Sequence, residues 1–179
     1  MTAADRMDLS CEVHSGGFQV MNLELEIGVD PESYEVAARY RTVGLLNWVL
    51  PWKSVARSEG RAQNGGVQPV FHRVEGKVHG RVRTVQAIHR DGMVGEVELM
   101  PPPSDDWDRE AVGEEERRHA ADPMSVIISA LHDLEVTGEC GGNRAVFVGR
   151  RRYDLKFNDG GHQRLERSST NVFAGEARL

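Results

Sequence analysis

The amino-acid sequence predicts a mainly β, α+β protein in which a curved antiparallel sheet packs on one amphipathic helix. Two observations favour the sheet: apolar and polar side chains alternate in successive stretches up to residue 100, and turn sequences separate these stretches about every ten residues. A third observation is one long helical pattern over residues 122–136. Strands joined by short turns form a meander, so we expect a single domain over residues 6–179 and a tail over residues 1–5.

The first two expected strands, residues 8–15 and 18–29, are joined by the turn Gly16-Gly17. Within 18–29 the alternation slips by one position at Met21, which indicates a β-bulge. The further strands, separated by turn sequences such as Asn-Gly-Gly and Asp-Gly, are expected at 34–43, 53–63, 67–76, 77–90 and 94–100.

The alternation stops at Pro101. Residues 101–121 are rich in proline and acidic side chains, and we interpret them as a long acidic loop with a short helical turn near residues 114–120. The helix over 122–136 has Asp122 as its N-cap and Pro123 at its first position. Its apolar stripe is expected to pack across one face of the sheet and comprises Met124, Ile127, Ile128, Leu131 and Leu134.

Four more strands are expected beyond the helix. Residues 144–148 and 150–157 form a hairpin around Gly149, and residues 163–169 and 171–179 continue the pattern. The last segment stops in mid-pattern, so we expect the natural polypeptide to continue past this point.

Composition argues against two classes of protein. The net charge of −6 disfavours sequence-independent nucleic-acid binding, which needs a concentrated positive face. No apolar run approaches the roughly 18 residues that a membrane span requires, so no transmembrane segment is expected. The first ten residues also lack the charged head and apolar stretch of a signal peptide.

The residue patterns of an enzyme are missing from the sequence. It contains no nucleophile elbow, phosphate loop, paired carboxylates or metal-ligand spacing, so we expect no catalytic residue, no metal and no cofactor. We interpret His72 and His89 as surface or half-buried residues, and Ser125 as a solvent-facing helix residue. Asp154 beside Arg152 is interpreted as an ordinary strand pair.

The stretch GLLNWVLPWKS, residues 44–54, places two of the three tryptophans on a connection between two strands. Pro51 prevents a regular helix from continuing through it. Two interpretations stay open. Its large apolar side chains either point inward and plug one end of the sheet, which is the common fate of such residues, or are exposed as an apolar lip. The side chains concerned are Leu45, Leu46, Trp48, Val49, Leu50 and Trp52.

Three stretches in this order resemble a family of exported bacterial proteins catalogued as a domain of unknown function: YEVAARYRTVGLLNWVLPWKSVARSEGR, DPMSVIISAL, and a cysteine followed by VFVGRRRYDLKF. The resemblance covers roughly residues 8–175. That family is similar in architecture to the lipoprotein localisation factors LolA and LolB, an open half-barrel with a helix across its concave face. The resemblance implies a periplasmic protein made with a signal peptide, and it implies no particular activity.

Cys11 and Cys140 are the two cysteines, and neither lies in a CxxC or Cys/His ligand pattern. An even pair fits one disulfide in an oxidising compartment and fits two separate buried thiols equally well. The family resemblance adds a third possibility, a bond between Cys140 and a cysteine just past Leu179. Members of that family often have such a cysteine, and they usually have an aromatic residue at the place of Cys11. A Cys11–Cys140 bond therefore competes with a bond to a residue beyond this sequence.

The leading functional hypothesis is a non-catalytic envelope protein that binds an apolar ligand, such as a lipid or a lipoprotein acyl chain. Its alternative is a structural or assembly protein of the envelope that contacts a protein partner through the 101–121 loop or an open sheet edge. An enzyme acting on cell-wall glycans is a third, weaker hypothesis. The expected ligand-binding side chains are Tyr34, Tyr40, Leu45, Leu46, Trp48, Leu50, Trp52, Met124, Ile128 and Leu131.

Overall fold

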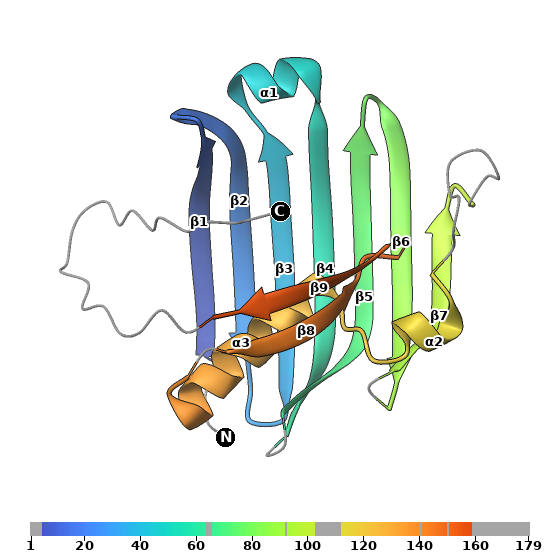
Figure 1. Cartoon of the computed structure of the whole chain (residues 1–179). Coiled ribbons are helices and arrows are strands. Elements are labelled where there is room, and N and C mark those ends of the chain that lie inside the picture. Colours follow the sequence, from blue (N-terminus) through green and yellow to red (C-terminus); the bar gives the residue numbers. More distant parts are fainter. Residues whose placement is uncertain are drawn as a thin grey trace.

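Seven antiparallel strands form one open sheet in chain order (Figure 1). The computed structural model describes residues 5–63, 66–91, 93–102, 112–139, 141–149 and 151–158. The strands are β1 (Asp5–Ser15), β2 (Phe18–Val29), β3 (Ser33–Thr42), β4 (Trp52–Gln63), β5 (Gly66–Val78), β6 (Arg81–Arg90) and β7 (Met93–Met100). Each pairs with its sequence neighbour, so the predicted meander is confirmed.

The strand register confirms the bulge and corrects one boundary. Val13 pairs with Met21 and His14 with Gln19, so Val20 is the extra residue on β2, next to the predicted slip. The sequence reading divided β5 from β6 between residues 76 and 77. The structure instead turns at His79-Gly80, where both residues have positive φ, 47° and 81°. A histidine in this conformation is uncommon, which is why the residue types typical of turns did not reveal the position of this turn.

The sheet has an inner and an outer face that differ in polarity. On β3, Tyr34, Val36 and Ala38 are buried on the inner face, while Glu35 and Arg39 on the outer face are exposed. The outer face carries ion pairs between neighbouring strands, such as Arg39 with Glu26. Such exposed pairs add little stability, but they keep this face solvated.

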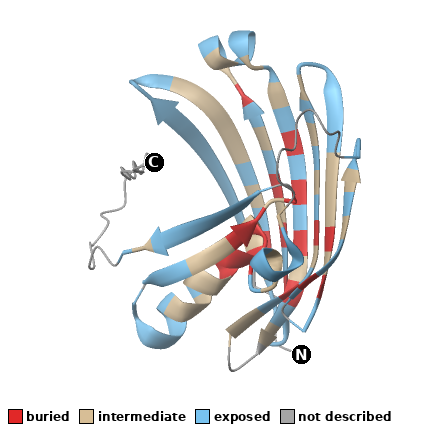
Figure 2. Ribbon diagram, turned by 45° about the vertical axis from the view of Figure 1, so that its right-hand side comes forward, coloured by how far each residue is buried: buried red, intermediate tan, exposed pale blue. Residues whose placement is uncertain are grey.

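A helix and a second small sheet cover part of the inner face (Figures 1 and 2). They are α3 (Pro123–Thr137) and the hairpin of β8 (Gly142–Phe147) and β9 (Arg152–Phe157). The hairpin is tied to the chain before α3, because Ala121 N–H donates to Ala145 O at 3.0 Å and Phe147 N–H donates to Ala121 O at 2.8 Å. The remaining helices are short: α1 (Gly44–Val49) and α2 (Glu114–Arg117).

Buried side chains gather where α3 and β8 cross the sheet (Figure 2). One apolar group joins β2 and β3 to α3 through Ile27, Tyr34, Val36 and Ile128. Another joins β6 and β7 to β8 and the segment after α2, and it comprises Ala87, Val94, Ala120 and Phe147. The predicted arrangement of one helix on one face of a sheet is therefore correct in outline, with an added hairpin.

The predicted packing stripe of α3 is only partly buried. Ile128 is buried and Met124 packs against the core, but Ile127, Leu131 and Leu134 are between 41% and 48% exposed. The buried residues of the helix are Ser125, Val126 and Ile128. The helix is rotated from the expected orientation because its first turn is bonded to the sheet through polar groups, as described below.

Some predictions fall on residues outside the described ranges. These are the strands at 163–169 and 171–179, residues 103–111 of the acidic loop, and Cys140. The short helical turn predicted near residues 114–120 corresponds to α2. The exposed pair of Arg152 and Asp154 is an ordinary strand ion pair at 2.9 Å, as expected.

Gly60 provides a test of how tightly β3, β4 and β5 meet. A Cβ built at Gly60 would lie 2.4 Å from the Tyr34 ring and from the carbonyl oxygen of Gln68. Gly60→Ala should therefore lower the free energy of unfolding by about 2 kcal/mol, measured by urea denaturation. Gly28→Ala, in the interior of β2 with its nearest neighbour 3.9 Å away, is the control and should change little. Equal stability of the two variants would contradict this packing.

Candidate functional site

A buried polar cluster joins the start of α3 to three strands. Ser58 Oγ on β4 donates to Asp122 Oδ1 at 2.7 Å and lies 2.8 Å from His72 Nδ1 on β5. The same ring nitrogen lies 3.2 Å from Asp122 Oδ1. From β3, Tyr34 Oη donates to Ser125 Oγ at 2.6 Å. We call these five side chains the Asp122 cluster.

Asp122 is also the N-cap of α3, as the sequence predicts. Its Oδ1 accepts the backbone N–H groups of Met124 at 3.0 Å and Ser125 at 3.1 Å, and its Oδ2 accepts the Ser125 hydroxyl. One carboxylate therefore satisfies two free N–H groups of the helix and three side-chain donors of the cluster. These hydrogen bonds turn Ser125 toward the sheet, so the prediction that Ser125 faces solvent is wrong.

The electrostatics of the cluster favour a charged Asp122. Burial alone would raise the pKa of this carboxyl, but hydrogen bonds from His72, Ser125 and Ser58 and the electrostatic effect of the nearby His72 ring hold the pKa well below its usual value. At Tyr34 the effect of burial prevails over that of the hydrogen bond with Ser125, and the pKa of the phenol is raised far above its usual value. The cluster thus contains a buried carboxylate whose lone pairs are occupied by donors.

Serine, histidine and aspartate side chains meet here, yet their geometry is not that of a nucleophilic site. In a catalytic triad the histidine lies between the nucleophile and the carboxylate, using one ring nitrogen for each. Here Asp122 Oδ1 bonds Ser58 directly, and both meet the same nitrogen, Nδ1, of His72. All members of the cluster are at most 3% exposed. The arrangement anchors α3.

His89, predicted to be at the surface or half-buried, is buried beside this cluster. Its side chain is 5% exposed, and neither ring nitrogen has a hydrogen-bond partner in the described part of the chain. Desolvation lowers its pKa, and the charge of His72 lowers it further against the opposing effect of Asp122. His89 is therefore a neutral core residue. His72 is likewise buried, contrary to expectation.

The structure separates the predicted ligand-binding residues. Tyr34 and Ile128 belong to the packed core, and Met124 packs against them, so this trio fills the space between α3 and the sheet. Leu131, by contrast, is 48% exposed on α3. Tyr40 and Trp52 lie side by side near the other end of the inner face, with ring centroids 4.9 Å apart in an edge-to-face arrangement.

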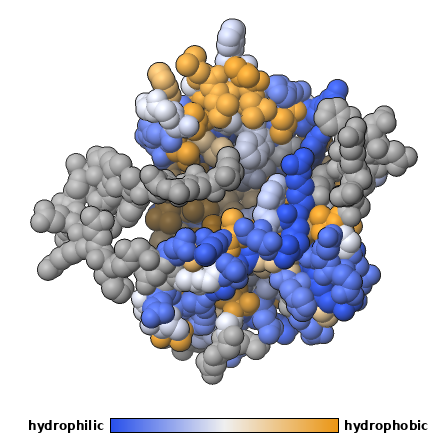
Figure 3. All heavy atoms as spheres, in the orientation of Figure 1, coloured by the Kyte–Doolittle hydropathy of each residue, from blue (hydrophilic) through white to orange (hydrophobic). Residues whose placement is uncertain are grey.

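The stretch between β3 and β4 forms α1, which has no buried residue. Leu45 is 70% exposed and Trp48 is 88% exposed, so the interpretation of these residues as an inward plug is wrong. Leu46 and Leu50 are half-buried, and Leu50 caps the helix immediately before Pro51. Figure 3 shows a concentrated apolar area at the end of the molecule that carries α1.

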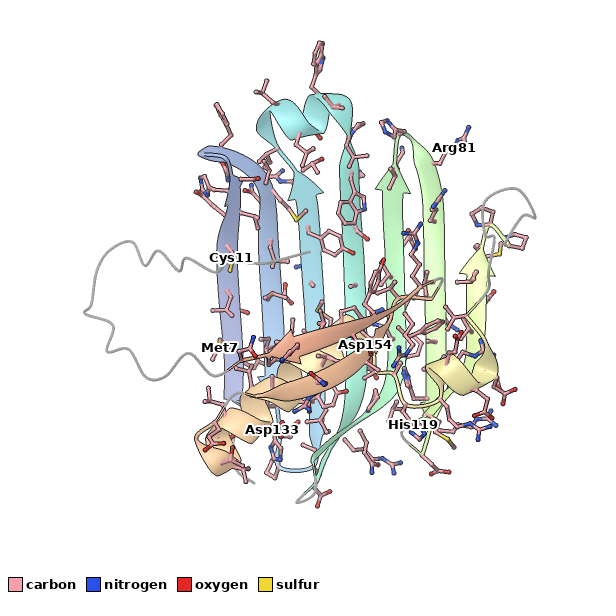
Figure 4. The ribbon with its side chains drawn as sticks, in the orientation of Figure 1. Met7, Cys11, Arg81, His119, Asp133 and Asp154 are labelled. Carbon is pink, nitrogen blue, oxygen red and sulfur yellow. The ribbon has the colours of Figure 1, made fainter. Side chains whose placement is uncertain are left out.

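Beside α1, part of the inner face is left uncovered by α3 and the β8–β9 hairpin. Its apolar side chains are half-buried or exposed, and they come from β1 to β5. We call this area the open inner surface and define it by Leu9, Val13, Met21, Leu23, Tyr40, Trp52 and Val78. Cys11, a free and exposed thiol, lies within it on β1 (Figure 4). A Cys11–Cys140 bond stays a prediction, because Cys140 lies outside the described residues.

Comparisons of the chain with protein-family models, curated proteins and solved structures find no match. The resemblance to the exported family therefore stays a prediction. Among the residues that the structure describes, no three histidine, cysteine, aspartate or glutamate side chains are grouped as metal ligands. None of the described helices is both long and apolar enough to cross a bilayer.

The anchoring role of Asp122 can be measured with Asp122→Asn, which keeps the size and the helix-capping ability of the residue. Its amide offers one acceptor oxygen in place of two and no charge, so buried donors lose partners. We expect the free energy of unfolding to fall by about 3 kcal/mol in urea denaturation. Asp154→Asn, which breaks the exposed pair with Arg152, should cost less than about 1 kcal/mol. Similar losses in both variants would rule out the anchor.

Buried neutral His89 should make stability depend on pH. Its pKa in the folded protein is lowered from the ordinary 6.5, so the unfolded chain binds the proton more tightly. Stability from this source is present above pH 6.5 and is lost as the pH falls below it. Asp122, with its lowered pKa, adds a further loss below its ordinary value of 3.8.

The measurement is the urea midpoint between pH 7 and pH 5, compared for the wild type and His89→Leu. The wild type should lose stability over this range, and the variant should lose distinctly less. His14→Gln, which removes an exposed histidine on β1, is the matched control. Parallel pH profiles for the wild type and His89→Leu would contradict the assignment.

Proposed function

We propose that the protein is a non-catalytic bacterial envelope protein that binds an apolar ligand, such as a lipid or the acyl chain of a lipoprotein, on the open inner surface. One observation supports this proposal: apolar side chains on the inner face of the sheet are only partly covered. The outer face, by contrast, is polar and carries ion pairs. Surfaces of this kind commonly mark binding sites for ligands or partners.

The chemistry of the surface suits a flexible hydrocarbon chain. Leu23 and Tyr40 face each other on β2 and β3, and Trp52 packs against Tyr40, so aliphatic and aromatic groups form a continuous strip. Each 100 Å² of apolar area that such a ligand covers would contribute about 2.5 kcal/mol. At the α1 end of the sheet, Leu45 and Trp48 are apolar and exposed as well.

The envelope location rests on a different argument. The three quoted sequence stretches resemble an exported family with a LolA-like and LolB-like half-barrel, and the open, curved antiparallel sheet with a helix on its inner face is compatible with that architecture. A periplasmic protein in contact with lipids or lipoproteins meets ligands of the chemistry proposed here.

Binding can be tested by titrating the protein with a fluorescent fatty acid and displacing it with unlabelled fatty acid. Leu23→Gln places an amide in the centre of the open inner surface and should weaken binding about tenfold or more. Val55→Gln makes a comparable change on the outer face, where Val55 is 50% exposed, and should leave affinity unchanged. Absence of displaceable dye at micromolar fatty acid, or equal loss in both variants, would contradict the proposal.

A second candidate function, assembly with a protein partner, is favoured by the edge of the sheet. All side chains described on β1 are exposed, and β1 pairs only with β2 among the described residues. An unpaired edge strand of this length can accept a strand from another chain. Pro substitution at Ser10 should abolish such pairing while the inner surface keeps its affinity for fatty acid, so the two candidates are separable.

A further inference from the structure

Three cationic side chains stand side by side on the outer face near α1. Arg41 on β3 pairs directly with Lys53 on β4, and Lys53 pairs directly with Lys77 on β5. Like charges at directly opposed positions repel one another and destabilise a sheet. We call Arg41, Lys53 and Lys77 the cation row.

Four other arginines of the outer face have carboxylate partners, whereas the exposed Arg6 and Arg61 have none among the described residues. Arg39, Arg57, Arg73 and Arg90 each form an ion pair with a glutamate on the same or a neighbouring strand. What distinguishes the row is that its three cations directly oppose one another on adjacent strands. Among the described residues, no member of the cation row forms an ion pair. Within the described ranges, three adjacent positive charges thus lack an ion-pair partner, in a protein whose net charge is −6.

The surface around the row is hollowed on both sides. A groove of about 570 Å³ is lined by the cation row together with Val55 and Val82, and its lining also includes Arg39, Glu24 and Glu75. Another of about 570 Å³ is lined by the same three cations and by Asn47 and Pro51. The carboxylates nearest the row belong to other arginines: Glu75 pairs with Arg73, and Glu24 acts on Arg39. The row therefore forms the shared wall of two concave areas.

We propose that the cation row is a binding site for phosphate-bearing ligands, separate from the open inner surface on the opposite face. A phosphate group has several strong acceptor oxygens and at least one full charge, and it would relieve the repulsion among three cations at once. Two sources share this chemistry, the headgroup of an anionic lipid and a phosphorylated solute, and the experiment below distinguishes them. This inference does not depend on the proposed binding of an apolar ligand.

Two binding measurements at constant ionic strength distinguish a lipid headgroup from a phosphorylated solute as the source of the phosphate. In the first, the protein is sedimented with phosphatidylcholine vesicles that contain or lack phosphatidylglycerol. In the second, backbone amide resonances are followed by NMR during titration with glycerol phosphate, with sodium sulfate as the control anion. Binding to phosphatidylglycerol vesicles alone identifies a lipid headgroup, and saturable shifts at residues 41, 53 and 77 with glycerol phosphate identify a soluble ligand.

The decisive variant is Arg41→Gln/Lys53→Gln/Lys77→Gln. Each cation near an anionic surface contributes about fivefold to binding, so this variant should lose about a hundredfold. Arg57→Gln/Arg61→Gln/Arg90→Gln removes the same charge from the same face but outside the row, and it leaves the Arg73–Glu75 pair in place. It should lose less than about threefold, because screening limits the reach of exposed charges to about 8 Å at physiological salt. The row variant should also melt no lower than the wild type, because it removes like-charge repulsion.

Equal loss of binding in the two triple variants would show general electrostatic attraction and overturn the site. So would the absence of binding in both arms. A melting temperature of the row variant well below that of the wild type would show that the three cations stabilise the fold, which contradicts their lack of internal partners. Fatty-acid binding by the row variant should be unchanged, which keeps this test independent of the open inner surface.

Discussion

The buried carboxylate of Asp122 determines how the inner face of the sheet is used. It caps α3 and accepts hydrogen bonds from the sheet, so helix formation and helix docking depend on the same two oxygens. A buried charge is costly unless it is hydrogen-bonded, and here both carboxylate oxygens accept hydrogen bonds. Because these bonds involve the first turn, α3 presents Ser125 and Val126 to the sheet and leaves Leu131 and Leu134 exposed.

That orientation explains why the inner face has two different regions. Where α3 and β8 cross, side chains such as Tyr34 and Ile128 form a closed core with no room for a ligand. Nearer α1, the sheet continues without a covering element among the described residues, and Leu23, Tyr40 and Trp52 remain incompletely buried. The outer face carries ion pairs such as those of Arg39 and Arg57, and close to α1 it carries a row of cations that have no ion-pair partner among the described residues.

Local sequence patterns predicted the elements of this fold well. Alternation identified the meander, the slip at Met21 identified a bulge, and Asp122-Pro123 identified the start of α3. These features depend on residues close together in the chain. The β5–β6 turn was misplaced because His79 adopts a positive φ that its residue type rarely shows.

Contacts between distant residues were beyond the reach of those patterns. Ser58 and Asp122 are 64 positions apart, and Tyr34 and Ser125 are 91 positions apart, so nothing in the local sequence reveals that they meet. The rotation of α3 follows from these contacts and was missed with them. The exposure of Trp48 was one of two interpretations that the sequence left open. Large apolar residues are usually buried, and only the geometry of α1 shows that this one is not.

The central claim is that the uncovered part of the inner face holds a hydrocarbon ligand. Native mass spectrometry of the protein, purified without detergent from a bacterial envelope, tests this most directly. The account predicts a population whose mass exceeds that of the polypeptide by one lipid or acyl chain and which loses this mass on mild activation. A protein that appears only at the mass of its own polypeptide, under conditions that preserve a known lipid carrier with its lipid, would contradict it.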